Sequence, residues 1–210
     1  MKIVCFDVDG TLININPNIW AILNKKYNFQ EQDNLLYNQY KEGVITYQQW
    51  VNSDFEHYIK SGLNRIIMEI IFKKYNPFSG VRETLEILRK TSNLNIVSGS
   101  IDFLLKVHNL DGYFNNIFIN KVSFDEDNIK NVEATPYDLD KKVEGLKLLT
   151  KRNVENVFYV GDGDNDIPLS KFMKEKGGNF IAFNSKSEEL KDNAKYVIHS
   201  EDMKDILYLI

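Results

Sequence analysis

The chain has a single cysteine, Cys5, and no apolar stretch approaching 20 residues. One cysteine excludes a disulfide framework within the chain, which is typical of proteins from a reducing compartment. The missing apolar stretch excludes a predicted transmembrane helix, and the apolar run that ends at Asp7 is too short for a signal peptide. We therefore expect a cytoplasmic protein with no membrane partner, in which Cys5 is a buried strand residue.

An excess of positive charge is also missing. The 26 lysines and arginines stand against 30 aspartates and glutamates, which gives a formal net charge of -4. This balance does not indicate nucleic acid as a partner. No internal repeat or low-complexity linker interrupts the 210 residues, so the length suits one large domain or a domain with a smaller insertion. Nothing in the sequence indicates an oligomeric state.

Short apolar runs recur along the chain and alternate with amphipathic segments. Continuous apolarity predicts parallel strands that are covered on both faces, and the alternation predicts a doubly wound, mostly parallel α/β sheet. The expected strands are 2–6, 94–98, 157–161, 180–183 and 196–199, with helices at 81–90 and 141–151. A β-hairpin or irregular flap is expected over 117–135, around the polar turn at 125–128.

Residues 13–78 break this alternation, because they contain four helix-like segments and no buried strand pattern. Aromatic residues are dense here and include both tryptophans, Trp20 and Trp50. We expect a helical domain at 13–78, inserted after the first strand of a core formed by 1–12 and 79–210.

Carboxylates gather directly after two of the expected strands. Asp7 and Asp9 follow the first, and VGDGDNDIPL places Asp162, Asp164 and Asp166 after the strand at 157–161. Ligands of doubly wound sheets bind beyond the carboxyl ends of the strands, so neighbouring strands would bring both clusters to one edge. A carboxylate pair can divide the roles of nucleophile and acid/base. Oxygen ligands without clustered histidine or cysteine indicate Mg²⁺ rather than zinc.

A calcium-binding loop of the EF-hand type is the competing interpretation. That loop needs glycine at its sixth position and glutamate at its twelfth. Counting from Asp162, these positions hold Ile167 and Met173. Counting from Asp7, they hold Leu12 and Asn18. Both stretches therefore fail the pattern.

Two further features suit a phosphate group. Ser98 ends an expected strand and is followed by Gly99, which offers a hydroxyl and free amides at a strand end. Lys141 and Lys142 begin an expected helix, where lysine is unfavourable for the helix dipole. Either lysine could serve the phosphate; Lys142 is preferred because Leu146 and Leu149 follow it in helical register.

Taken in order, these motifs resemble those of the haloacid dehalogenase superfamily. FDVDGTL, IVSGS, a lysine near 142 and GDGDND match its four motifs over 1–12 and 79–210. The helical insertion is similar to that superfamily's C1 cap. The cap stretch EGVITYQQW and the tail YVIHSEDMKDILYLI resemble the phosphoserine phosphatase-like branch most closely.

The resemblance implies a Mg²⁺-dependent phosphatase that acts on a small phosphorylated metabolite. Asp7 would attack phosphorus to form an aspartyl-phosphate, and Asp9 would move the protons. The metal ligands would be Asp7, the carbonyl of Asp9, Asp162 and Asp166. The phosphate-binding residues would be Ser98, Gly99, Lys142 and Asn165. Asp164 lies where the family varies and receives no role.

The chain departs from the phosphoserine phosphatases at two substrate-binding positions. The family carries a glutamate and an arginine that recognise phosphoserine, and the matching positions here hold Asn16 and Asn52. Phosphoserine is therefore doubtful as the substrate, and the substrate itself cannot be read from the sequence. By position, the candidate substrate contacts are Asn16, Tyr47, Trp50 and Asn52.

Two other functions fit the same motifs. A phosphomutase would use Asp7 and Asp9 but return the phosphoryl group to its substrate, so it would release no inorganic phosphate. A non-catalytic phosphate-binding or regulatory protein would be expected to lose one of the three key aspartates, yet Asp7, Asp9 and Asp162 are all present. Dehalogenase chemistry is disfavoured because its relatives generally lack the second aspartate, and transport ATPases are excluded by the missing membrane spans.

Overall fold

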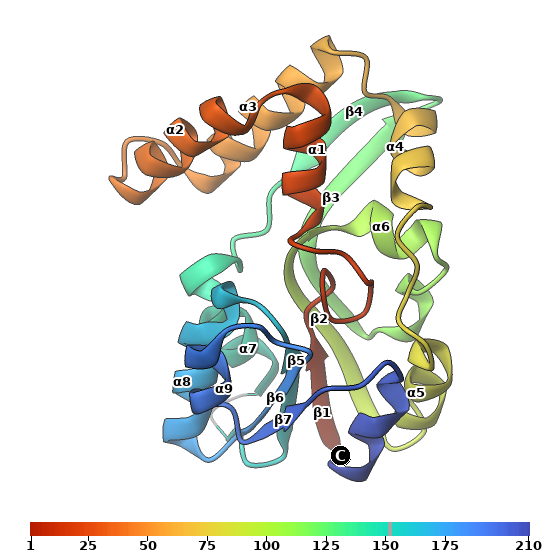
Figure 1. The fold of residues 1–210 in the computed structure, drawn as a ribbon, viewed down its shortest axis with the longest axis vertical. Helices are drawn as coiled ribbons and strands as arrows, with labels where there is room; N and C mark the ends of the chain where they lie inside the picture. The colour runs from red at the N-terminus through yellow and green to blue at the C-terminus, as the bar shows by residue number, and fades with distance from the viewer. Residues whose placement is uncertain (151–152) are drawn as a thin grey trace.

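A seven-stranded sheet organises the molecule, which a computed structural model describes over residues 1–150 and 153–210 (Figure 1). The strand order is β4-β3-β2-β1-β5-β6-β7. All neighbouring pairs are parallel except β3 and β4. The strands are β1 (Lys2–Phe6), β2 (Ser92–Ile101), β3 (Asn116–Asp125), β4 (Asn128–Glu133), β5 (Val157–Gly161), β6 (Asn179–Phe183) and β7 (Tyr196–Ile198). The doubly wound, mostly parallel sheet predicted from the sequence is confirmed.

The segment from 117 to 135 does form a hairpin, and both of its strands belong to the seven-stranded sheet because β3 also pairs with β2. The first half of β3 pairs with β2 in parallel, and its second half pairs with β4 around the turn at 125–128. The sequence predicted only the hairpin. Because β4 contains no buried residue, its sequence lacks the continuous apolar run that predicts a strand inside a sheet. The sequence therefore did not indicate that the hairpin extends the main sheet.

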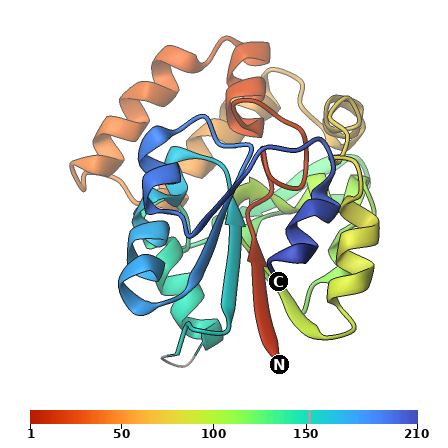
Figure 2. The same cartoon turned by 60° about the horizontal axis from the view of Figure 1, so that its bottom comes forward.

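Helices cover both faces of the sheet (Figure 2). Alternate side chains of the central strands point to opposite faces, so Val4 and Phe6 join one core and Cys5 joins the other. Helix α5 (Val81–Leu88) packs on the first face beside η4 (Met203–Tyr208). The second face is covered by α7 (Lys142–Thr150), α8 (Ile167–Lys176) and α9 (Glu188–Asn193). The helix predicted at 141–151 ends at a residue outside the described part of the chain.

Four helices occupy the segment after β1: α1 (Ile19–Tyr27), α2 (Gln30–Lys41), α3 (Tyr47–Lys60) and α4 (Arg65–Phe72). Local signals set their ends. Asn18 caps α1 by accepting from the amide of Ala21, and Thr46 and Gln49 form a capping box at the start of α3. The helical character of 13–78 agrees with the sequence, whereas the exact domain boundaries remain a prediction.

Helices α1, α2 and α3 lie beyond the carboxyl ends of the strands, and α4 packs against α6 (Asp102–Val107) (Figure 1). Several hydrogen bonds tie the helices to the core, and two of them come from aromatic side chains. The Trp20 indole donates to the carbonyl of Gly99 over 2.8 Å, and the Tyr47 hydroxyl donates to Oδ2 of Asp138 over 2.7 Å. Within 1–150 and 153–210, no helix is both long and apolar enough to cross a membrane.

Candidate active site

The two acidic clusters meet at the carboxyl edge of β1 and β5, which are parallel neighbours. This pairing meets the condition under which the sequence places both clusters at one edge. Asp7 directly follows β1 and Asp162 directly follows β5. Gly10 has a φ of 75°, and a Cβ at this position would lie 2.0 Å from Oδ2 of Asp162. Glycine both tolerates this left-handed backbone and leaves room for the carboxylate. The turn after β1 is thereby able to bring the two clusters together.

Lys142 lies beneath these carboxylates and is fully buried. Its Nζ donates to Oδ2 of Asp7 over 3.0 Å and to Oδ1 of Asp166 over 2.7 Å. Burial alone would lower the pKa of Lys142, but Asp166, Asp7 and Asp138 outweigh it and raise the pKa above its usual value. Lys141 is exposed. Of the two lysines left open by the sequence, the structure brings only Lys142 to the carboxylates.

Asp166 is fixed on both of its carboxylate oxygens. Besides Lys142, the Tyr159 hydroxyl donates to Oδ1 over 3.1 Å. The amides of Asp162 and Gly163 donate to Oδ2 over 3.2 and 3.4 Å. Asp162 accepts from the Thr11 hydroxyl over 2.9 Å. Tyr159 was not expected from the sequence, because a tyrosine within a buried strand is not distinctive until the fold is known.

The donor set fits a divalent cation. One carboxylate oxygen each from Asp7, Asp162 and Asp166 lies within 4.8 Å of the others. Burial, followed by the charge of Asp7, raises the pKa of Asp162 to about 8. Burial likewise raises the pKa of Asp166 to about 6, although Lys142 opposes it. One lysine does not offset these carboxylates, and an all-oxygen donor set is what hard cations prefer. Among the described residues, no hydrogen bond ends on the carbonyl oxygen of Asp9, which leaves it free to coordinate.

Asp9 has a different environment from Asp7. Its Oδ2 accepts from the amide of Ile19 over 2.8 Å, and its Oδ1 accepts from the Ser100 hydroxyl over 2.7 Å. Burial raises the pKa of Asp9 to about 7, with the charge of Asp7 acting in the same direction. A carboxyl group with this pKa can donate and recover a proton near neutral pH.

The predicted phosphate-binding residues lie around the same centre. Ser98 is buried at the cavity wall, and its hydroxyl accepts from the amide of Ser100 over 3.1 Å. Gly99 faces Asp138, and a Cβ at Gly99 would lie 2.1 Å from Oδ2 of Asp138. Asn165 also lines the cavity, but within the described chain it forms no hydrogen bond with Lys142. Asp138 was not expected from the sequence.

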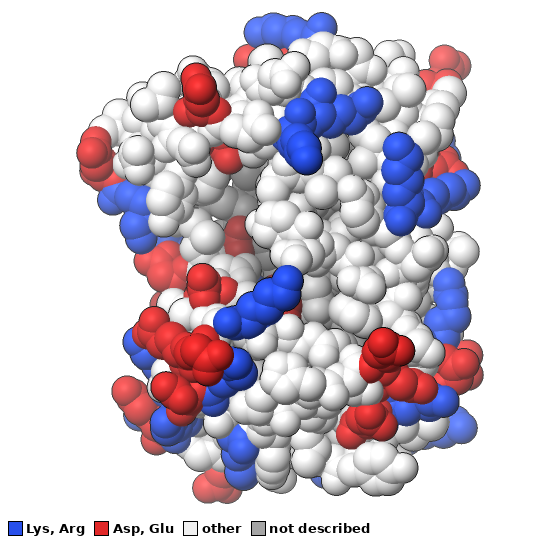
Figure 3. Space-filling model, viewed as in Figure 1, with Lys and Arg blue, Asp and Glu red and all other residues white. Residues whose placement is uncertain are grey.

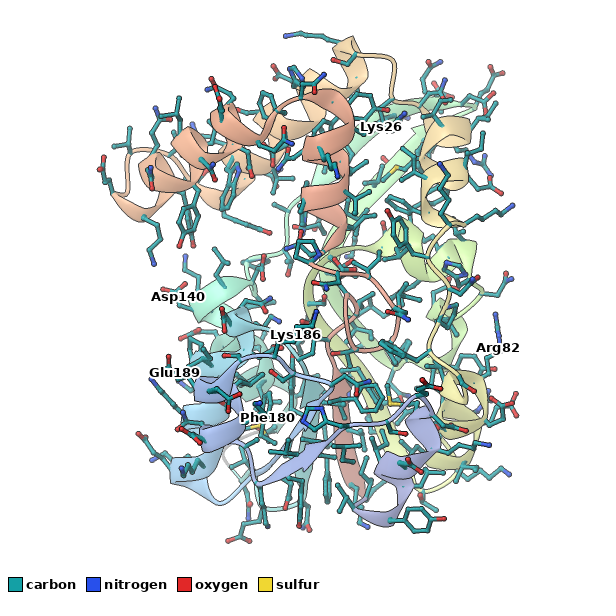
Figure 4. The ribbon with its side chains drawn as sticks, in the orientation of Figure 1. Lys26, Arg82, Asp140, Phe180, Lys186 and Glu189 are labelled. Atoms are coloured by element: carbon teal, nitrogen blue, oxygen red, sulfur yellow. The ribbon has the colours of Figure 1, made fainter. Side chains whose placement is uncertain are left out.

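A cavity of about 1020 Å³ opens above this centre and extends beneath α1, α2 and α3. Figure 3 shows this face hollowed between the helices and the core, with acidic side chains visible inside the hollow. Lys186, labelled in Figure 4, lines the cavity from the loop between β6 and α9. Candidate substrate contacts predicted from the sequence that line the cavity are Asn16, Tyr47 and Trp50.

Asn52 does not reach the cavity. It is exposed and accepts a hydrogen bond from Gln48 over 2.7 Å. At 100° per residue, Tyr47, Trp50 and Asp54 share one face of α3, whereas Asn52 points elsewhere. The expectation that Asn52 occupies the substrate-facing position is therefore corrected. Asp54, two residues later, lines the cavity instead.

The geometry agrees with comparisons to known proteins. A family model for haloacid dehalogenase-like hydrolases matches residues 1–171. The chain is 29% identical to the phosphoserine phosphatase of Methanocaldococcus jannaschii, over 100% of this chain and 97% of that protein. It is also 29% identical to the pyridoxal phosphate phosphatase of Bos taurus, over 83% of this chain and 80% of that protein.

The fold is similar to a solved structure of a phosphoserine phosphatase in its apo form. That structure has a TM-score of 0.72 and 24% identity, with 100% of this chain and 98% of the other covered. The chain therefore belongs to the haloacid dehalogenase-like hydrolases, and its relatives place it in the phosphoserine phosphatase-like branch, as the motifs indicated. The named relatives are phosphatases, which supports the predicted class of enzyme, a phosphoric monoester hydrolase.

Proposed function

We propose that this protein is a Mg²⁺-dependent phosphatase that hydrolyses a small phosphomonoester through an aspartyl-phosphate on Asp7. The observation that carries the proposal is the placement of Asp7. Its carboxylate is held by Lys142 and by the amide of Val8, beside Asp162 and Asp166, and it lines the cavity of about 1020 Å³. The proposed role of each group follows from its position at the carboxyl edge of β1 and β5.

Asp7 is the nucleophile because its position is fixed on both oxygens. The amide of Val8 donates to Oδ1 over 2.8 Å and Lys142 donates to Oδ2 over 3.0 Å. A lone pair of the carboxylate attacks phosphorus, and the bond from phosphorus to the ester oxygen breaks. Lys142 compensates the negative charge that gathers around the transferred group.

Asp9 is the acid and then the base. In its neutral form it protonates the departing ester oxygen, and as a carboxylate it takes a proton from the water that hydrolyses the acyl-phosphate. Both steps need a pKa near the working pH, and burial raises the pKa of Asp9 to about 7. Ser100 and the amide of Ile19 hold this carboxyl in place.

The cation would be held by the carboxylates of Asp7, Asp162 and Asp166 and the carbonyl oxygen of Asp9. When bound, it supplies the positive charge that lets a carboxylate approach a phosphate dianion. Ser98, the amides around Gly99, Lys142 and Asn165 are the proposed phosphate-binding groups. Mg²⁺ is preferred because the donors are oxygen only and the ester itself supplies further oxygens.

Release of inorganic phosphate from a panel of esters tests the proposal. The panel contains O-phosphoserine, pyridoxal 5′-phosphate and phosphates of simple alcohols whose alkyl group carries no charge, each assayed with Mg²⁺ and with EDTA. We expect Mg²⁺-dependent phosphate release from at least one ester. Conversion of an ester to an isomer without phosphate release would instead identify a phosphomutase. Binding without either reaction would identify a non-catalytic protein.

A further inference from the structure

At the end of the cavity formed by the helices lie two aspartates, Asp33 of α2 and Asp54 of α3, called here the acidic pair. The two differ in how they are held. Asp54 is only 3% exposed, yet its carboxylate makes no hydrogen bond among the described residues, and its Oδ1 is fully buried without a partner. A buried carboxylate without partners is costly to maintain, so it is an unusual feature of a folded protein.

Asp33 is fixed beside it by two donors. The Trp50 indole donates to Oδ1 over 2.6 Å, and the side-chain amide of Asn24 donates to Oδ2 over 2.7 Å. The Tyr58 hydroxyl donates to Oδ1 of Asn24 over 2.6 Å and so orients that amide. Asp33 is therefore a rigid, hydrogen-bonded carboxylate, whereas Asp54 has free acceptor capacity.

The acidic pair has no counter-charge of its own among the described residues. Burial raises the pKa of Asp54 to about 8, and the charge of Asp33 adds to the effect. Burial also raises the pKa of Asp33, against its two hydrogen bonds. Lys186 is the only basic residue among the described residues that line the cavity, and it comes from the core rather than from the helices. No basic side chain from this part of the chain neutralises the pair.

Aromatic rings surround the same space. Tyr37, Tyr47 and Trp50 line the cavity, and the Trp50 ring lies 5.5 Å from that of Tyr37 and 5.8 Å from that of Tyr47. Carboxylates combined with aromatic faces are the surroundings that ammonium groups prefer. An apolar or anionic group would leave Asp54 without a partner, and an anionic group would also be repelled.

We propose that the acidic pair binds a positively charged ammonium group of the substrate, with Asp54 as the direct partner, so that the preferred esters are phosphates of amino alcohols. The inference rests on the proposed function, because the phosphate of the same molecule would lie at Asp7. One cavity connects the two ends. The alkyl part of the substrate would then lie along the aromatic rings.

Two esters of the same shape test this inference. In 2-aminoethyl phosphate an ammonium group occupies the place of the terminal methyl group of propyl phosphate. With Mg²⁺ present, we expect kcat/KM for 2-aminoethyl phosphate to exceed that for propyl phosphate by about 10- to 100-fold, the range of a charged hydrogen bond in a desolvated site. In Asp54→Asn this ratio should fall to about 1.

Glu56→Gln is the matched control, because it removes one carboxylate from the same helix at an exposed position outside the cavity. It should retain the wild-type ratio. The ratio is measured on one preparation, so a reduced folded fraction cancels and does not affect it. A wild-type ratio near 1, or an unchanged ratio in Asp54→Asn, would overturn the inference.

The same pair of esters separates failure of the inference from failure of the proposed function. Release of phosphate from both esters at similar rates would reject the ammonium site and leave the phosphatase intact. If neither these two esters nor any ester of the panel above releases phosphate, the phosphatase proposal fails. The ratio of the calorimetric Kd of propyl phosphate to that of 2-aminoethyl phosphate, measured with Mg²⁺, then tests the ammonium site in place of the kcat/KM ratio.

Discussion

Carboxylates lie at both ends of the cavity, but the two ends differ in the hydrogen bonds and the counter-charge that these carboxylates receive. At the strand edge, Asp7 and Asp166 share a buried lysine, and Asp166 also accepts from a tyrosine and two backbone amides. Beneath the helices, Asp33 is held by two donors while Asp54 has none. The strand edge contains its own counter-charge, whereas the helical end lacks one.

This difference distinguishes a rigid part of the site, at the strand edge, from a part that selects the substrate, beneath the helices. Carboxylates held by a network keep a fixed geometry, as a nucleophile and a metal site require. A carboxylate left unpaired gains most from a ligand that supplies the missing charge. The following predictions change one end at a time, in order of decreasing effect.

Asp7→Asn should reduce phosphate release by at least about 10⁴-fold, because the amide keeps the shape of the side chain but is not a nucleophile. Measured on any ester that the wild type hydrolyses, the loss should come with native circular dichroism. Asp164→Asn is the control: it removes a carboxylate from the same motif at an exposed position and should retain activity. Comparable loss in both variants would contradict the role of Asp7.

Removal of divalent cations with EDTA should lower activity by about 100-fold or more, because the clustered carboxylates would then repel a phosphate dianion. Addition of Mg²⁺ in excess should restore it. The measurement is phosphate release before chelation, after chelation and after restoration of the metal. Full activity in EDTA would show that the cluster at the strand edge works without a cation.

Lys142→Met should lower the free energy of unfolding by about 3–5 kcal/mol, because it leaves two buried carboxylates without their counter-charge. Urea denaturation measures the change. Lys141→Met, at the exposed neighbouring position, should alter stability by less than about 0.5 kcal/mol. Equal effects of the two substitutions would contradict the assignment of Lys142 as the buried partner.

Asp54→Asn should change how stability depends on pH. The folded-state pKa of Asp54 is raised to about 8, so the folded protein holds a proton that the unfolded chain releases above about pH 4. Its contribution to stability is complete below that pH and is lost as the pH rises through about 8. The variant cannot titrate at this position.

The melting temperature of Asp54→Asn relative to wild type should therefore rise by about 7 °C or more between pH 5.5 and pH 8.5. Melting curves in buffers of constant ionic strength provide the measurement, with Glu56→Gln as the control that shows no such trend. A difference in melting temperature that is constant over this pH range would mean that folding does not raise the pKa of Asp54.

Much of the strand edge could be predicted from the sequence because its information is local. A parallel strand ends where its apolar run ends, so Asp7 and Asp162 could each be placed at the carboxyl end of a strand. That these two strands are neighbours is known only from the structure. Lys142 could be preferred to Lys141 from helical register, and its burial agrees. The ligand, catalytic and phosphate-binding roles remain proposals.

The residues at the helical end could not be predicted, because they come from different helices. An error of two residues in placing a motif on a helix also moves the side chain to another face of that helix. Position 52 was expected to face the substrate, but position 54 lines the cavity instead. Asp33 meets Asp54 only when α2 packs on α3, a contact that no local pattern encodes. Likewise, β3 could be recognised as part of a hairpin but not as a strand of the main sheet.

The central claim is that Asp7 becomes covalently phosphorylated. Rapid acid quenching of the protein during turnover, followed by borohydride reduction, converts an aspartyl-phosphate to homoserine, and peptide mass spectrometry then locates the modified residue. We expect homoserine at position 7 in the wild type and none in Asp7→Asn. Phosphate release during turnover without homoserine at position 7 would contradict the claim.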